Sequence, residues 1–229
     1  MADTPQETSL QGGLAAIFKA VAEGTLVLFL KNLLDAWEVW TQLRDHARYH
    51  GMYEILDYRS TLDLSDETGE KATISRRQMI RFLQDNVVAI HDHAWGDGNL
   101  FAKYKCRPGV PVDFYQDGSK HNVLISLRET KNRGDVMEFS AERTIAGGFL
   151  KQNEWLETEV DHLTTHLRLA IIFPKARPCL RATLTRKTVG KTEVLDERHF
   201  KTLGSGRQEL SLAISRPKLH ECYLVKWDW

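Results

Sequence analysis

The sequence has few cysteines and no repeating pattern of glycine or proline. Its three cysteines, Cys106, Cys179 and Cys222, lie far apart, and no two of them have CxxC spacing. A sparse, odd number of cysteines excludes a disulfide-based scaffold and is typical of a reducing compartment. The composition is that of a globular chain, which excludes a collagen-like or extensively disordered protein.

An excess of either charge and a long hydrophobic run are also missing. The 31 basic and 31 acidic side chains cancel, whereas proteins that coat nucleic acid carry a strong basic excess. The most apolar stretch, Thr25–Leu30, is far shorter than the about 20 residues of a membrane-spanning helix. Met1–Gly13 is polar and acidic, without the basic start of a signal peptide. We therefore expect a soluble, cytoplasmic protein.

The first pattern along the chain is helical and covers residues 14–49, between Gly12-Gly13 and Gly51. The spacing predicts a long amphipathic helix, or a helix pair if Gly24 interrupts it. We expect this helix to pack on its own β domain, to associate with another copy or a partner helix, or to lie on a membrane. Its apolar stripe consists of Leu26, Phe29, Leu30, Leu33, Trp37 and Trp40.

After Gly51 the apolar residues alternate with a period of two, as in strands. About ten short strands, separated by turn signals such as Asp117-Gly118 and Val189-Gly190, indicate a mainly antiparallel, β-sandwich-like body. The predicted fold class is therefore α+β. The domains are a helical segment, 1–50, and a β-rich body, 51–229, with a candidate division of the body near 146–160.

The first candidate site is the pair His91 and His93. On a strand both side chains project to the same face, with Asp92 opposite, and could begin a metal site. Such a site needs a third ligand, and no spacing identifies one. The alternative is that both histidines are ordinary surface or edge residues. The available third ligands are His121, His162, His166, Asp97 and Asp113.

The second candidate is a basic stretch hidden by the zero net charge. Seven basic residues and no acidic residue lie between Asp161 and Glu193. This stretch could bind a nucleotide signal, a short nucleic acid or an acidic partner. It contains only one aromatic, Phe173, and the alternative is a solvated face of a sheet. The residues are Arg168, Lys175, Arg177, Arg181, Arg186, Lys187 and Lys191.

Other motifs do not indicate a site. Thr188–Thr192 ends like a phosphate loop but has Thr185 where that motif requires glycine, so it predicts a hairpin turn. Arg76 and Arg77 cannot share a strand face, and we expect them to cap a turn or to pair with Glu67 or Asp85. No motif indicates a catalytic residue or a cofactor.

Four strings resemble an uncharacterised family of small bacterial β-rich proteins. The resemblance covers about residues 50–229 and implies no established activity and no functional residue. A helical segment joined to a β-sandwich is similar to accessory components of bacterial defence or stress-signalling operons, by analogy of fold alone. The strings are Arg81–Asp85, Ala94–Gly98, Ile125–Val136 and Tyr223–Trp229.

The sequence thus favours a non-enzymatic recognition or assembly module. In this hypothesis the β-rich body binds a partner or ligand, and the N-terminal helix mediates self-association or docking to a protein partner. Two alternatives stay open: a sensor of an anionic ligand that uses the basic 168–191 strands, and a metal-dependent enzyme that uses His91 and His93.

Overall fold

The computed structural model describes residues 51–229. The predicted helix over 14–49, together with its apolar stripe, lies outside the described residues. Residues 51–229 form fourteen strands and one short 3-10 helix, Glu197–His199. The predicted α+β class is wrong: the described chain is mainly β, because the helical period ends before Gly51 and every later apolar period is that of a strand. Across these residues, no helix is long and apolar enough to cross a membrane.

The largest sheet has seven strands in the order β12-β13-β9-β1-β2-β7-β4. Strand β1 pairs in parallel with β9, and the other neighbours are antiparallel. The strands are β1 (Tyr53–Asp63), β2 (Lys71–Phe82), β4 (Asn99–Arg107), β7 (Val136–Ala146), β9 (His166–Phe173), β12 (Phe200–Thr202) and β13 (Gln208–Ser215).

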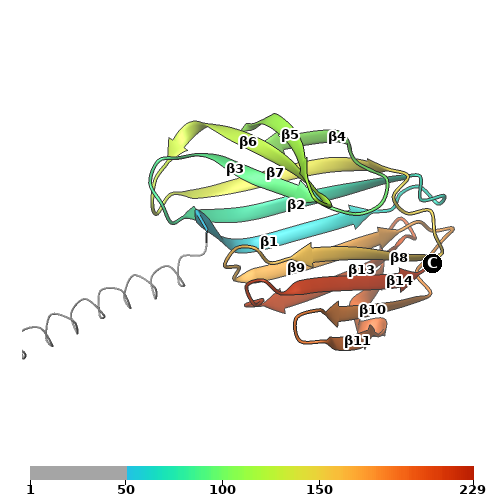
Figure 1. Ribbon diagram of the computed structural model, residues 1–229. Helices are drawn as coiled ribbons and strands as arrows, with labels where there is room; N and C mark the ends of the chain where they lie inside the picture. Colours follow the sequence, from blue (N-terminus) through green and yellow to red (C-terminus); the bar gives the residue numbers. More distant parts are fainter. Residues whose placement is uncertain (1–50) are drawn as a thin grey trace, which may run out of the picture. The chain divides into compact units, whose positions relative to one another are not determined.

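Two smaller sheets cover one face of the large sheet (Figure 1). A three-stranded sheet, β3-β6-β5, lies over one part of it, and a four-stranded sheet, β11-β10-β14-β8, lies over the other. Strands β3 and β8 are therefore edge strands. The strands are β3 (Val87–Ala94), β5 (Val110–Asp117), β6 (Lys120–Lys131), β8 (Asn153–Glu159), β10 (Arg181–Arg186), β11 (Lys191–Leu195) and β14 (Cys222–Asp228).

The large sheet contributes to two separate hydrophobic cores through the same long strands. Tyr53 and Phe82, which are register partners on β1 and β2, pack under the three-stranded sheet. Leu62 and Ile74, further along the same two strands, pack under the four-stranded sheet with Trp227. Between the two cores, the inward-facing side chains are polar. This polar middle positions the candidate site.

The strand predictions agree closely with the structure. The expected alternation from Tyr53 is β1, and the expected turns at Asp117-Gly118 and Val189-Gly190 join β5 to β6 and β10 to β11. The body has more strands than the predicted ten because β8 and β12 carry weak patterns. The candidate division near 146–160 stays a prediction; β9, beyond it, pairs with β1 in the large sheet.

Candidate functional site

A cavity of about 100 Å³ lies over the polar middle of the large sheet. Its floor comes from β1, β2 and β7, and its rim from residues 91–97 and 154–159, which include the ends of edge strands β3 and β8. The cavity lies where the two smaller sheets meet rather than beneath either one. A space of this volume can hold several water molecules or a small chemical group.

The register of the strands places two arginines on the floor. Arg76 of β2 is opposite Ser60 of β1 and Ala141 of β7, and Arg143 lies two residues along β7 on the same face. Neighbouring inward positions on these strands hold buried apolar residues such as Ile80. The two arginines therefore occupy positions that strand alternation assigns to the interior.

Asp92 of β3 meets the first arginine from above. Its Oδ1 lies 2.7 Å from Nη1 of Arg76, and its Oδ2 accepts a hydrogen bond of 2.9 Å from the Tyr104 hydroxyl. Asp92 is 3% exposed. Burial acts to raise the pKa of Asp92, but the charges of Arg76 and Arg143 outweigh it and hold the pKa below its ordinary value. The carboxylate is thus ionised at neutral pH.

Arg143 has no comparable partner. Its Nη1 donates to the backbone carbonyl of His93 at 3.2 Å, and its guanidinium carbon lies 5.6 Å from the centre of the Phe101 ring. The buried Nε of Arg143 and the buried Nε of Arg76 have no hydrogen-bond partner among residues 51–229. Because an unpaired buried polar group costs about 1–3 kcal/mol, these two atoms require an explanation.

The rim carries an Asp–His arrangement. Oδ1 of Asp161 lies 3.0 Å from Nδ1 of His162, and its Oδ2 lies 3.7 Å from Nδ1 of His93. Burial acts to raise the pKa of Asp161, but the His162 hydrogen bond and the two imidazoles lower it to about 2. Burial lowers the pKa of His93, against the opposing effect of Asp161. His162 stacks on Tyr53, and His93 stacks on Trp95, which gives the rim an aromatic surface.

The other rim carboxylates have their own cations or donors. Glu157 pairs with Lys187 at 2.5 Å, and Glu159 pairs with Lys120 at 2.7 Å. Glu154 accepts a hydrogen bond of 2.6 Å from the backbone N–H of Lys151. None of these partners lines the cavity, and among residues 51–229 no ion pair joins these three acids to the arginines on the floor.

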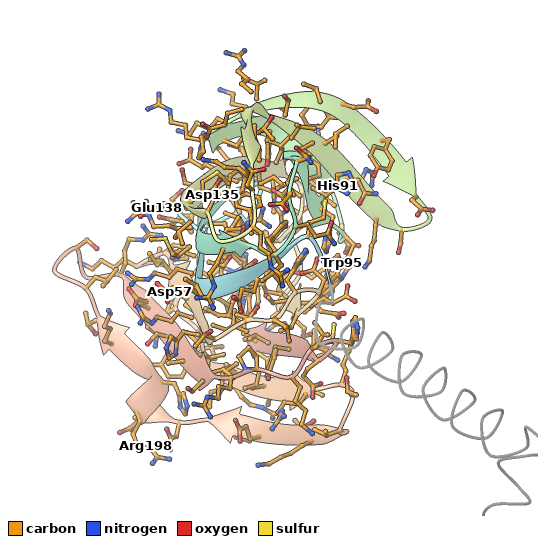
Figure 2. The ribbon with its side chains drawn as sticks, turned by 90° about the vertical axis from the view of Figure 1, so that its left-hand side faces the viewer. Asp57, His91, Trp95, Asp135, Glu138 and Arg198 are labelled. Atoms are coloured by element: carbon orange, nitrogen blue, oxygen red, sulfur yellow. The ribbon has the colours of Figure 1, made fainter. Side chains whose placement is uncertain are left out.

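Both members of the predicted metal pair lie on the rim of the cavity, but their surroundings differ. His91 and His93 do share the outward face of β3, but His91 is exposed, whereas His93 turns toward Asp161. Figure 2 shows His91 and Trp95 on the side of the smaller sheets, with Asp57 and Glu138 on the opposite side. Within residues 51–229, no three His, Cys, Asp or Glu side chains gather in a way that could hold a metal ion.

The basic stretch is divided between surfaces. Arg168 lies on β9 of the large sheet and contacts Asp57 at 3.7 Å, whereas the other six residues belong to the four-stranded sheet or its loops. Arg177 lies over the Trp229 ring at 3.8 Å. Three of the residues form ion pairs: Arg186 with Glu221, Lys187 with Glu157, and Lys191 with Glu193. The remaining two basic residues are Lys175 and Arg181. The structure does not bring the seven residues together into one patch.

The floor residues were missed by reasoning from the sequence. Arg76 does not cap a turn or pair with Glu67 or Asp85, as we expected; it faces inward, while Arg77 faces outward and pairs with Glu138. A usable signal was present, because Arg76 and Arg143 each interrupt the apolar phase of a long strand. Asp92 likewise interrupts the apolar phase of β3, because it lies two residues after the buried Ile90.

Together, the fold and the site define a β-sandwich with a charged, partly enclosed cavity between its two smaller sheets. No protein-family model matches the sequence, and no curated protein matches it. Among solved structures, an M1 zinc metallopeptidase from Deinococcus radiodurans in complex with a Tyr-Ser-Ala substrate is similar, with a TM-score of 0.45 and 8% identity over 76% of this chain. A two-domain M1 zinc metallopeptidase bound to L-tryptophan gives a TM-score of 0.47 and 9% identity. The chain spans 42% of the length of either protein.

Proposed function

We propose that this protein is a non-enzymatic recognition module whose β-rich body binds a small ligand in the cavity between the two smaller sheets. One observation carries the proposal: two guanidinium groups line a cavity that opens between edge strands, and the Nε of each is buried without a hydrogen-bond partner among residues 51–229. Ligand sites are typically concave and contain a few convergent polar groups of this kind.

The arrangement supports binding better than catalysis. The Asp161–His162 pair orients an imidazole, but no serine, threonine or cysteine hydroxyl or thiol forms a hydrogen bond to that imidazole among the described residues. Of the cysteines, Cys222 has a pKa raised to about 12, mainly by burial and by the Glu157 hydrogen bond, which opposes the thiolate form.

A pair of neighbouring substitutions tests the cavity. Ser60 points into it from β1 and is 8% exposed, whereas Thr61 faces the opposite side of the sheet. Ligand-observed NMR of the full chain against a library of small metabolites should find binders that Ser60→Leu loses and Thr61→Leu retains. If every binder survives Ser60→Leu in a folded protein, the cavity is not the ligand site.

The assembly part of the proposal concerns residues 1–50. The apolar residues Leu26, Leu30 and Trp37 of this segment are candidates for self-association or for docking to a protein partner. The resemblance to accessory proteins of bacterial defence or stress-signalling operons suggests the process in which this association would take part. Light scattering of the full chain, and of a chain that starts at Gly51, should show a larger particle for the full chain alone. Two monomers would exclude self-association.

A further inference from the structure

Two guanidinium groups on the cavity floor face a single carboxylate, that of Asp92. The rim acids Glu157, Glu159 and Asp161 have their own partners in Lys187, Lys120 and His162. Arg76 and Arg143 contribute two guanidinium groups, which stay protonated in proteins. Asp92 contributes one carboxylate, whose Oδ1 forms an ion pair with Arg76 and whose Oδ2 accepts a hydrogen bond from Tyr104. The excess charge is therefore located on Arg143.

No carboxylate within residues 51–229 forms an ion pair with Arg143, whose one hydrogen bond goes to a backbone carbonyl. Burial lowers the pKa of Arg143, and Arg76 lowers it further, against the attraction of Asp92. A largely buried cation that forms no ion pair of its own is unfavourable, and Arg143 only shares the charge of Asp92 with Arg76. The fold thus holds a positive charge at a place where an anion would be strongly favoured.

We infer that the cavity recognises the carboxylate of a small organic acid, with Arg143 as the residue that binds it. The inference rests on the proposed function of the cavity. One negative charge neutralises the one excess positive charge, and the planar guanidinium matches a carboxylate through two parallel hydrogen bonds. A phosphate dianion would instead leave an excess negative charge in the cavity.

The rim indicates what the rest of the acid looks like. Trp95 and Trp155 line the cavity mouth, and the Trp95 ring already stacks on His93 at 5.4 Å between centroids. These flat surfaces suit an aromatic or other planar group. The cavity of about 100 Å³ holds the carboxylate and a few attached atoms, and the remainder lies against the rim.

Three matched probes test the inference on the full chain: benzoate, its neutral analogue benzamide, and the dianion phenyl phosphate. Titration followed by NMR or calorimetry should show saturable binding of benzoate, at least about tenfold tighter than either of the other two probes. Arg143→Met should lose benzoate binding by about the same factor. Arg77→Met, on the outer face of β2, should bind benzoate as the unmodified chain does.

Thermal unfolding separates binding from structure. Because Met replaces an unpaired buried cation with an apolar side chain of similar length, Arg143→Met should not lower the melting temperature. If this variant does not fold, Arg143→Lys, which keeps the charge but loses the planar fork, should weaken benzoate binding in a folded protein. Normal benzoate binding by either folded variant would overturn the role of Arg143.

The other possible results separate failure of the carboxylate assignment from failure of the proposed function. Tighter binding of phenyl phosphate, or equal binding of benzamide and benzoate, would overturn the carboxylate assignment and leave the cavity as a ligand site. The assignment alone would also fail if none of the three probes binds while other library compounds depend on Ser60. Only the absence of every Ser60-dependent binder would overturn the proposed function itself.

Discussion

Asp92 illustrates how a single charge is tolerated inside this sandwich. It is held by one guanidinium and one phenol hydroxyl, and the second arginine lies near enough to lower its pKa further. Removing one member of a buried ion pair leaves the other uncompensated, which costs far more than the pair itself contributes. The charge of Asp92 therefore stabilises Arg76 and Arg143 together.

We expect Asp92→Asn to lower the free energy of unfolding by about 3–5 kcal/mol at neutral pH, because two buried cations then have no carboxylate. Urea unfolding measures the change. The control is Glu138→Gln, which removes an exposed partner of Arg77 and should cost less than about 1 kcal/mol. Equal effects of the two substitutions would contradict the buried-pair assignment.

The ion pair of Asp92 with Arg76 makes the stability of the folded protein depend on pH. The pKa of Asp92 is lower in the folded protein than its ordinary value of 3.8. Its contribution is therefore fully present above that ordinary value and is lost as pH falls through the lower folded pKa. The difference in stability between the unmodified chain and Asp92→Asn should be constant from pH 7 to about pH 5 and should shrink in strong acid.

At the scale of elements, the turns that join the strands depend on particular glycines. Gly69, in the β1–β2 turn, has φ of +78°, and a Cβ added there would lie 1.8 Å from the carbonyl oxygen of Phe149. Gly118, in the β5–β6 turn, has φ of +58° with no atom within 4 Å of an added Cβ. The two positions share a left-handed backbone but differ in the space available.

We therefore expect Gly118→Ala to cost about 1–2 kcal/mol, the ordinary penalty for a side chain at positive φ. Gly69→Ala should cost clearly more, because the backbone of the neighbouring loop must also move. Thermal and urea unfolding of the two variants measure the difference. Equal costs would show that the contact between Gly69 and Phe149 is not tightly constrained.

Strand positions could be predicted from the sequence because side-chain alternation is a local property. Strands β1, β6 and β14 begin and end within a few residues of the expected limits. The arrangement of the sheets could not be predicted, since the parallel pairing of β1 with β9 joins segments about a hundred residues apart. The cavity depends on that arrangement: Arg76, Asp92 and Arg143 come from three strands in two sheets, and no sequence spacing links them.

At the scale of the whole body, the two hydrophobic cores share the strands of one sheet. Phe82 belongs to the core under the three-stranded sheet, and Trp227 belongs to the core under the four-stranded sheet. Strands β1 and β2 pass through both cores, so loss of one core removes the support of the other. We infer that residues 51–229 unfold as one cooperative unit.

Hydrogen exchange can test this cooperativity through Phe82→Ala. The substitution empties a fully buried site and should cost about 3–5 kcal/mol. If the cores are coupled, the slowest amides of β14, in the other core, should lose the same protection free energy as those of β6. Phe114→Ala, at a site 53% exposed, should change both by less than about 0.5 kcal/mol. Unchanged protection in β14 after Phe82→Ala would mean that the sandwich contains two independently unfolding halves, with the cavity at their boundary.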